Sequence, residues 1–197
     1  MATGILYLIR HGLIWSNVEH VYAGRTAERL TEQGMRQANQ VGREMKDWGI
    51  STVYASPLAR TIQTAEILNR HLRAELVLEP DILEMDLGPW TGLSKSEVMS
   101  KFPREYRTWA ESPSEFMLEG METLQDVLRR TIRFLVKLRT EKPAETTAAV
   151  THSVVIRCAI LYCNNLPLNS YGSLIVPNLS VHRIIFDTDG GSIERVR

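Results

Sequence analysis

The chain has 197 residues, and its 23 lysines and arginines balance its 23 aspartates and glutamates to give a formal net charge of zero. This length is typical of one domain, so we expect a single domain over residues 1–197 with one sizeable core. Apolar residues make up 44% of the chain and charged residues 23%, which excludes disordered, collagen-like and coiled-coil classes. The lack of a basic excess argues against a nucleic-acid partner.

The sequence also lacks the pattern of a signal peptide or a membrane span. The amino-terminal apolar run carries no basic leader and is broken at Arg10. The longest later run, Val154 to Cys163, is interrupted by Arg157 and is shorter than the ~20 residues that a span needs. Two cysteines are too few for a disulfide framework, and their separation of five residues on a predicted helix is too wide for a disulfide between them. We therefore expect a cytoplasmic protein with no membrane partner.

Hydrophobic patterns predict strands that alternate with helices along the chain. In chain order, the predicted elements are a strand at 5–9, a helix at 31–48, a strand at 52–55, a helix from 56–57 to 72, a strand at 75–78, a short helix capped by Ser94, a helix at 124–138, a strand at 146–151, a helix at 153–163, and a hairpin of 179–187 and 192–196 with its turn at 189–191. This order predicts the α/β class, as a three-layer α/β/α sandwich with a mostly parallel central sheet.

Two local features refine this prediction. Ser56 and Pro57 have the pattern of a helix cap followed by proline at the first helical position. Residues 93–121 fit the strand and helix alternation least, so we expect them to form an excursion over the site.

Basic residues gather at three predicted strand ends. The first strand ends in Arg10 and His11, the second leads through Ser56 to Arg60, and the fourth ends in His152 at the start of a helix. These ends share one edge of a parallel sheet, where α/β proteins bind ligands and helix amino termini favour anions. Two arginines and two histidines at such an edge predict an oxyanion pocket, most plausibly for phosphate.

Each of these residues has an ordinary structural explanation when it is taken alone. A single arginine at a strand end usually forms a surface ion pair, and a single histidine there is usually a hydrogen-bonded structural residue. Glu84 is one of 23 acidic residues and by itself would be a solvated carboxylate. The coincidence of three strand ends favours a site, and the glycine-punctuated loop from Glu84 to Gly92 makes Glu84 a catalytic candidate.

These residues resemble a family. The segment Leu8-Ile9-Arg10-His11-Gly12 is similar to the signature of the histidine phosphatase superfamily, the phosphoglycerate mutase-like clan. The resemblance continues in the family's order along nearly the whole chain. The further matching segments are Leu30 to Gly34 with Gln37-Ala38, Ser56 to Ala65, Glu84 to Gly92, and Thr151-His152. The arginine-histidine-glycine tripeptide is weak evidence alone, whereas the ordered set is specific.

The resemblance implies a mechanism and a set of residues. His11 would be the nucleophile that forms a phosphohistidine, and Glu84 would protonate the leaving oxygen and then activate water. The implied phosphate-binding residues are Arg10, Arg60, His152, Asn17 and Ser153. The pocket supplies positive charge from its own side chains, so no metal and no cofactor are expected.

The chain departs from the family pattern in three places. Leu13-Ile14 stands where polar residues usually follow the first motif, Ser153 replaces a glycine after the second histidine, and Thr26 to Leu30 lacks the common Asp-x-Pro. None of these changes affects the proposed His-Arg-Arg-His-Glu set.

The sequence therefore predicts a metal-independent phosphatase of the histidine acid type, a phosphoric monoester hydrolase acting on small phosphomonoesters. One alternative is a phosphoglycerate mutase, which the chain length disfavours. The other is a non-catalytic module that binds a phosphorylated ligand. A homodimer is compatible with the sequence, which names neither the substrate nor the oligomeric state.

Aromatic and methionine side chains cluster near residues 85–121, including Trp90, Phe102, Tyr106, Trp109 and Phe116. They predict either a small satellite core or an apolar wall over the phosphate pocket.

Overall fold

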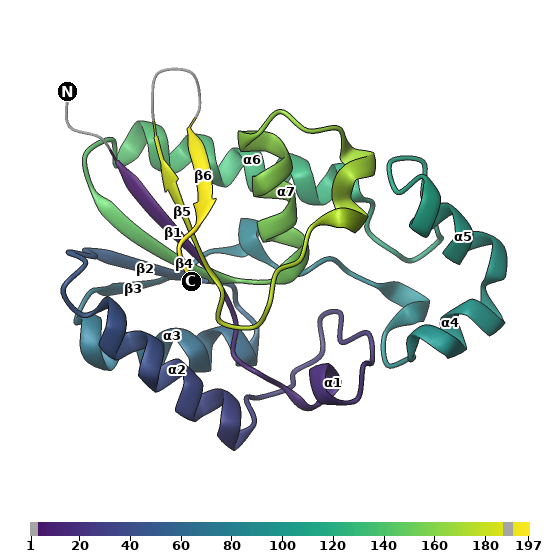
Figure 1. The fold of residues 1–197 in the computed structure, drawn as a ribbon, viewed down its shortest axis with the longest axis horizontal. Coiled ribbons are helices and arrows are strands. Elements are labelled where there is room, and N and C mark those ends of the chain that lie inside the picture. The colour runs from purple at the N-terminus through teal and green to yellow at the C-terminus, as the bar shows by residue number, and fades with distance from the viewer. Residues whose placement is uncertain (1–3, 187–190) are drawn as a thin grey trace.

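A six-stranded sheet forms the centre of the protein, with the strand order β3-β2-β4-β1-β5-β6 (Figure 1). The computed structural model describes residues 4–186 and 191–197. The strands are β1 (Ile5–Arg10), β2 (Thr52–Ala55), β3 (Glu75–Leu78), β4 (Thr146–Thr151), β5 (Val181–Ile185) and β6 (Ser192–Arg195). The first four run parallel, and β5 and β6 are antiparallel to their neighbours. The predicted mostly parallel sheet is confirmed.

Helices cover both faces of this sheet. The longer helices are α2 (Glu32–Met45), α3 (Ala59–Leu72), α6 (Leu124–Glu141) and α7 (Ser153–Cys163). The shorter ones are α1 (Trp15–Val18), α4 (Lys95–Lys101), α5 (Pro103–Glu111) and the 3₁₀ turns η1 (Pro80–Ile82), η2 (Gly88–Trp90) and η3 (Leu168–Ser173). Figure 1 shows α2 and α3 below the sheet and α6 and α7 above it. The three-layer α/β/α architecture is thus as predicted.

The side-chain alternation of β1 explains the two layers of core. Tyr7 and Ile9 pack into a cluster with α2 and α3, whereas Leu6 and Leu8 pack into a cluster with α6 and α7. Successive residues of a strand point to opposite faces, so one apolar strand supplies both cores.

The start of α3 differs from its prediction. The helix begins at Ala59, and Leu58 occupies the N-cap position without a side-chain hydrogen bond. The predicted cap by Ser56 and the first helical position of Pro57 are therefore wrong. The hydroxyl of Ser56 instead lies 2.7 Å from His152 Nε2, so a tertiary contact takes the side chain that sequence assigned to a cap.

Other predicted boundaries are close to the structure. β2, β3, β4 and α7 match their predicted ranges, whereas α2 ends at Met45 rather than Trp48. The capping box at Ser94 is confirmed. β5 and β6 pair as the predicted antiparallel hairpin, and residues 189 and 190 of its predicted turn at 189–191 lie outside the described residues.

Residues 93–121 lie at one end of the molecule, beyond the sheet, where Figure 1 shows α4 and α5. Trp90 is fully buried at the centre of an aromatic cluster there. Its ring centroid lies 5.2 Å from that of Phe116, 6.1 Å from Trp109, 6.3 Å from Tyr106 and 6.5 Å from Phe102. This geometry supports the satellite-core alternative, and the cluster is continuous with the core on the α6 and α7 side.

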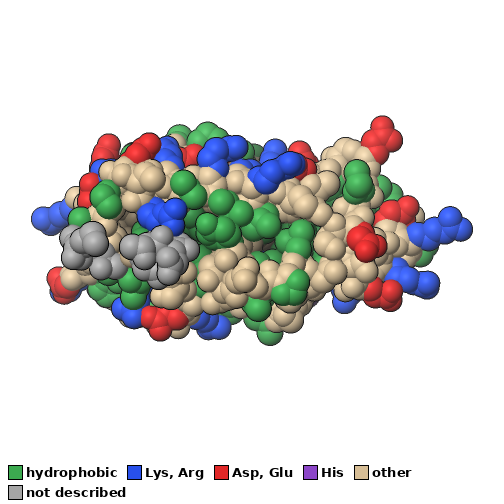
Figure 2. Space-filling view, turned by 90° about the horizontal axis from the view of Figure 1, so that it is seen from above, with side chains coloured by type: hydrophobic (Ala, Val, Ile, Leu, Met, Phe, Trp, Pro, Cys, Tyr) green, Lys and Arg blue, Asp and Glu red, His purple; other side chains and the backbone are tan. Residues whose placement is uncertain are grey.

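Seen from above α6 and α7, hydrophobic side chains gather in the middle of the face, and charged side chains lie mainly along its rim (Figure 2). A small depression of about 190 Å³ in this region is lined by Leu128, Leu161, Tyr162, Asn165, Leu166 and Leu168. In the part of the chain that the structure describes, no helix has the length and apolar character to cross a membrane.

Candidate active site

The carboxyl ends of β1 and β4 place two histidines side by side. Arg10 pairs with Thr151 in the parallel register, so His11 and His152 follow directly from paired positions. The His11 amide donates to the Thr151 carbonyl at 2.9 Å. The two imidazole centroids lie 5.3 Å apart with a tilt of 60° between the rings. The structure thus brings together two residues that are far apart in the sequence.

The His11 imidazole is held in one tautomer. Its Nδ1 lies 2.8 Å from the Gly12 carbonyl oxygen, which only accepts, so Nδ1 carries the proton and Nε2 carries the lone pair. The side chain is buried. Burial, reinforced by the charges of Arg60 and Arg10, places the pKa of His11 well below its usual value. The ring is therefore neutral, as a nitrogen nucleophile must be.

Two guanidinium groups flank this ring. Arg60 is 1% exposed on the first turn of α3, and it donates to the Thr26 carbonyl at 3.0 Å and to the Gly24 carbonyl at 2.6 Å. Arg10 donates to the Val176 carbonyl at 2.7 Å. Among the described residues, neither arginine has a carboxylate within ion-pair distance, and burial lowers the pKa of both. This edge therefore holds two positive charges that carbonyl groups orient and that form no ion pair among the described residues, and the Glu84 carboxylate opposes the fall of both pKa values.

His152 and Glu84 complete the group around His11. His152 is fully buried, and its Nδ1 lies 4.0 Å from Glu84 Oε2. That Nδ1 has no hydrogen-bond partner among the described residues. Burial raises the pKa of the Glu84 carboxyl, and the charge of Arg60 opposes the shift. A carboxyl with a raised pKa is suited to give and take a proton near neutral pH.

Asn17 and Ser153 lie at the border of this group. Asn17 Oδ1 accepts a hydrogen bond from Asn178 Nδ2 at 2.9 Å, and Asn178 also donates to the His11 carbonyl at 3.0 Å. This contact holds the Asn17 oxygen and leaves its amide N–H groups as donors. Ser153 is the first residue of α7 and is half-buried beside His152. The first N–H groups of a helix have no partner within the helix, so α7 adds donors at this edge.

A charged clamp, formed by Glu122, Arg130 and Arg25, holds the loop that carries Glu84. Glu122 accepts from Arg130 Nε at 2.9 Å and Nη2 at 3.1 Å, and from Arg25 Nη2 at 2.9 Å. Arg130 also donates to the backbone carbonyl of Leu83, and Arg25 donates to that of Glu84 at 2.9 Å. The clamp thus binds the two peptide carbonyls that precede and follow the Cα atom of Glu84.

Sequence reasoning missed several of these supporting residues. Asn178, Glu122, Arg130 and Arg25 belong to no motif, and only the fold brings them to the site. Arg157, whose charge acts on Arg10, could have been found from the sequence, because it is the one charged residue of an apolar helix.

Leu13 and Ile14, which stand where the family usually has polar residues, contribute to packing. Ile14 is fully buried in the core on the α2 and α3 side. The Leu13 carbonyl accepts from the Thr31 amide at 2.9 Å. Gly34 packs so closely on Leu13 that an added Cβ would lie 2.4 Å from its carbonyl oxygen. These contacts fix the loop after His11 against the start of α2.

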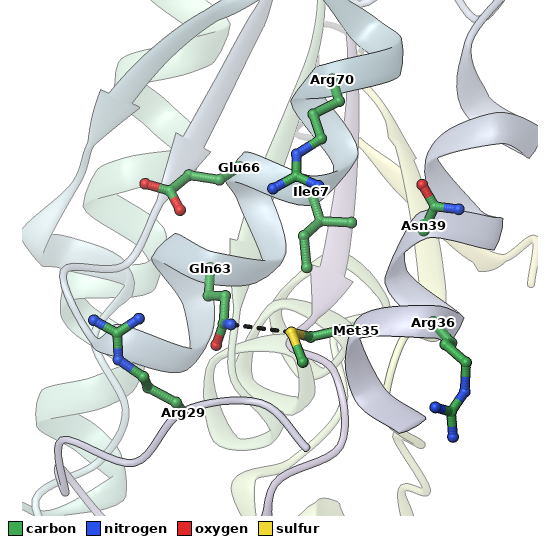
Figure 3. A pocket seen from close by; sticks show the side chains of 8 residues that line it. All are labelled: Arg29, Met35, Arg36, Asn39, Gln63, Glu66, Ile67 and Arg70. Carbon is green, nitrogen blue, oxygen red and sulfur yellow. Dashed lines mark hydrogen bonds between the residues drawn. The ribbon is translucent and has the colours of Figure 1, made fainter. Parts of the chain in front are cut away.

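A separate pocket of about 380 Å³ lies between α2 and α3 (Figure 3). Figure 3 shows Gln63 hydrogen-bonded to Met35 inside it, with arginines at its margin. It contains none of the residues that the sequence assigned to the site.

Within residues 4–186 and 191–197, no group of three or more His, Cys, Asp or Glu side chains is arranged to hold a metal ion.

Comparison with known proteins agrees with this geometry. The family model of the histidine phosphatase superfamily (branch 1) matches residues 6–197, and the chain belongs to this family. It is therefore a member of an enzyme family whose relatives include phosphatases. The name histidine acid-type phosphatase belongs to a different family, so that part of the sequence prediction is corrected.

Individual relatives give further detail. The chain is 34% identical over 158 residues to phosphoserine phosphatase 1 of Hydrogenobacter thermophilus, covering 80% of this chain and 74% of that protein. It is 28% identical over 184 residues to a probable phosphoglycerate mutase GpmB of Cronobacter sakazakii, covering 91% and 83%. The solved structure of Bacillus stearothermophilus YhfR matches with a TM-score of 0.89 and 26% identity over 98% of this chain and 95% of that one. A mycobacterial glucosyl-3-phosphoglycerate phosphatase matches with a TM-score of 0.86 at 21% identity over 98% and 97%, a likeness of fold.

Proposed function

We propose that this protein is a metal-independent phosphatase that hydrolyses small phosphomonoesters through a phosphohistidine on His11. The observation that carries the proposal is the pair of imidazole rings 5.3 Å apart, with the buried Arg60 acting on both and Glu84 4.0 Å from His152. A nitrogen nucleophile, fixed positive charges and a carboxyl of raised pKa are the groups that phosphoryl transfer needs.

The first step transfers the phosphoryl group from the ester to the enzyme. The lone pair of His11 Nε2 attacks phosphorus as the ester P–O bond breaks, and the leaving oxygen takes the proton of Glu84. Arg10, Arg60 and His152 hold the three other oxygens, with Asn17 and the α7 amides at the rim. The positive charges stabilise the transition state because they are already oriented by carbonyl groups.

The second step returns the enzyme to its starting state. Glu84, now ionised, takes a proton from a water molecule that attacks phosphorus. The P–N bond breaks, inorganic phosphate leaves, and His11 regains its neutral ring. The same carboxyl serves as acid and then as base, which requires a pKa near the working pH.

The two alternative functions are less well supported. A phosphoglycerate mutase uses the same groups but must keep the phosphoenzyme from water. The relative with the higher identity is named a phosphatase, and the mutase-named relative is more distant. A non-catalytic binding module would not need a nucleophile, an acid and two phosphate-binding arginines together.

The test is the chemical form and the fate of the transferred phosphate. Brief incubation with a ³²P-labelled monoester and alkaline quench should leave acid-labile label on the peptide that contains His11. The label should then appear as inorganic phosphate rather than on a second organic acceptor. His11→Asn should abolish both, whereas His71→Gln, at a histidine hydrogen-bonded to Asn39 between α2 and α3, should change neither. Label on His152 or on a serine would refute the assignment, and transfer to an organic acceptor would favour the mutase.

The remaining expectations extend this proposal. We propose one domain over residues 1–197, with residues 93–121 as an excursion beside the site, and a cytoplasmic enzyme without nucleic-acid or membrane partners. The zero net charge supports the absence of a nucleic-acid partner. A homodimer remains a prediction, which sedimentation at several protein concentrations tests.

A further inference from the structure

Arg157 is a charged residue in a place that packing does not explain. It lies on α7 between Ile156 and Cys158, which are both buried, and it is the one charged residue of that helix. It follows Ser153 by one helical turn, so both lie on the face that begins at the phosphate pocket. Long side chains on a helix lean toward its amino terminus, which here is the pocket. The position therefore directs a guanidinium toward the bound ester.

The surroundings hold this guanidinium without neutralising it. Its central carbon lies 4.8 Å from the ring centroid of Tyr171, a cation–π contact. Its Nε is buried without a hydrogen-bond partner among the described residues, and no ion pair links Arg157 to a carboxylate in that part of the chain. Burial lowers the pKa of Arg10, the Glu84 carboxylate opposes that shift, and the charges of Arg157 and Arg60 add to it, so Arg157 acts electrostatically on Arg10. Among the described residues neither Arg10 nor Arg157 forms an ion pair with a carboxylate, and unpaired guanidinium groups favour an anion from solution.

The aromatic support under Arg157 is rigid. Tyr171 is buried on η3, and its ring centroid lies 5.3 Å from that of Trp109 on α5. The chain after η3 reaches Val176, whose carbonyl accepts from Arg10. The same segment of chain therefore supplies Tyr171, which contacts Arg157, and the Val176 carbonyl, which orients Arg10.

We propose that Arg157, stacked on Tyr171, is a second anion subsite that selects phosphomonoesters bearing a further carboxylate or phosphate close to the ester group. This inference rests on the proposed function, since it takes the phosphoryl group to lie between His11 and His152. A guanidinium presents paired N–H groups that match a planar carboxylate or a phosphate, and its stacked plane fixes their direction. The subsite lies on the α7 and η3 side of the pocket, away from Arg60 and its carbonyl partners Gly24 and Thr26.

The test compares esters that differ in one anionic group. The first pair is 3-phosphoglycerate and glycerol 3-phosphate, in which a hydroxymethyl group replaces the carboxylate. The second pair is fructose 1,6-bisphosphate and fructose 6-phosphate, so the two arms separate a carboxylate from a phosphate. The wild-type enzyme should prefer the more charged member of at least one pair in kcat/KM.

The variant Arg157→Met keeps most of the side-chain length over Tyr171 and removes the charge. It should lower kcat/KM for the preferred, more charged ester about 10- to 100-fold, the usual worth of a charged hydrogen bond, and change the other member less than about twofold. Arg157→Lys should recover part of the loss. Arg129→Met, at an exposed arginine of α6, is the matched control and should change neither ester.

Two outcomes overturn the inference. One is a wild-type enzyme that does not discriminate within either pair, and the other is an equal loss of kcat/KM for both members in Arg157→Met.

If the wild-type protein releases no phosphate from any ester, p-nitrophenyl phosphate included, the proposed function fails and calorimetry tests the subsite. Wild type should then bind 3-phosphoglycerate or fructose 1,6-bisphosphate more tightly than its less charged counterpart, and Arg157→Met should lose the difference. An equal affinity within both pairs rejects the subsite.

Discussion

Burial shifts the pKa values of Glu84 and His11 in opposite directions, because burial favours the neutral form of each. The pKa of Glu84 rises, so its carboxyl keeps a proton for the leaving oxygen. The pKa of His11 falls, and its ring stays neutral and nucleophilic. Burial at one edge of the sheet thus prepares both an acid and a nucleophile. The nearby Arg10 and Arg60 reinforce the shift on His11 and oppose the shift on Glu84.

The role of Glu84 predicts a dependence on the leaving group. Glu84→Gln keeps the size of the side chain and removes its proton, so phosphorylation by an alkyl ester should slow by a factor on the order of 10²–10⁴. p-Nitrophenyl phosphate has a weakly basic leaving group, so phosphorylation by it should slow far less. Single-turnover phosphorylation of Glu84→Gln with both esters measures this difference.

The control for this experiment is Glu66→Gln at an exposed position of α3, which should behave as wild type. Hydrolysis of the phosphoenzyme should slow in Glu84→Gln with either ester, because the base is also removed. An equal drop in the phosphorylation rate for both esters would mean that Glu84 orders the pocket and donates no proton.

At the scale of elements, the loop after η1 depends on a charge far from the reacting atoms. Glu122→Gln removes the partner of the buried Arg130 and of Arg25, which together hold the Glu84 loop. Loss of one partner of a buried pair costs about 3 kcal/mol or more in the free energy of unfolding. We expect Glu122→Gln to be less stable and to lose kcat with alkyl esters while KM changes little.

A purely structural role for Glu122 predicts a different pattern. It would reduce the amount of folded enzyme, and therefore the rate, equally for alkyl and p-nitrophenyl esters. A positioning role reduces the single-turnover phosphorylation rate of the folded enzyme mainly with the alkyl ester, because only that ester needs the Glu84 proton. Glu119→Gln in the same loop is exposed and serves as the matched control.

The segment from 93 to 121 contains residues with separable roles. Phe116 is 2% exposed and contacts Trp90, so Phe116→Ala should lower the free energy of unfolding by about 3–5 kcal/mol.

Trp109 is half-buried and contacts Tyr171, the residue whose ring lies against Arg157. Trp109→Ala should raise KM for esters with an apolar or aromatic part more than for small polar esters. Steady-state kinetics on both kinds of ester tests this expectation, and an equal rise on all of them would assign Trp109 to packing alone.

For the whole molecule, buried histidines predict a loss of stability in acid. Burial lowers the pKa of His11, His152 and His182, the last to about 4, from the ordinary histidine value of about 6.5. Each folded-state pKa lies below the unfolded value, so unfolding takes up protons and stability falls as the pH drops below about 6.5. The limiting slope is about 1.4 kcal/mol per pH unit for each histidine. Glu84 acts in the opposite sense, because its raised pKa contributes stability at low pH that is lost as pH rises through the folded value.

Urea unfolding at pH 7.5 and 5.5 measures this effect, and the more acidic sample should be the less stable. His182→Leu removes one buried histidine from β5 and should reduce the difference between the two pH values. A free energy of unfolding that rises between pH 7.5 and 5.5 would contradict the prediction.

The sequence determined much of the fold because local patterns and tertiary packing agree there. The apolar run of β1 supplies both faces of the sheet, so its burial could be predicted from composition alone. The strand ends at Arg10 and His152 could be predicted to meet, since parallel strands share an edge. The start of α3 could not be predicted, because Ser56 contacts a residue 96 positions away in the chain.

Only the tertiary structure decided which charges remain without a counter-ion. In the sequence, Arg130 lies among other charged residues of its helix and Arg157 is the one charged residue of its helix, and neither pattern names a partner. Folding buries Arg130 against Glu122, where it fastens the Glu84 loop, and it stacks Arg157 on Tyr171 without a carboxylate. Sequence patterns record the polarity of a residue and its spacing to near neighbours. The pairing of two charges depends on the distance between elements, which is fixed only when the sheet and its helices pack together.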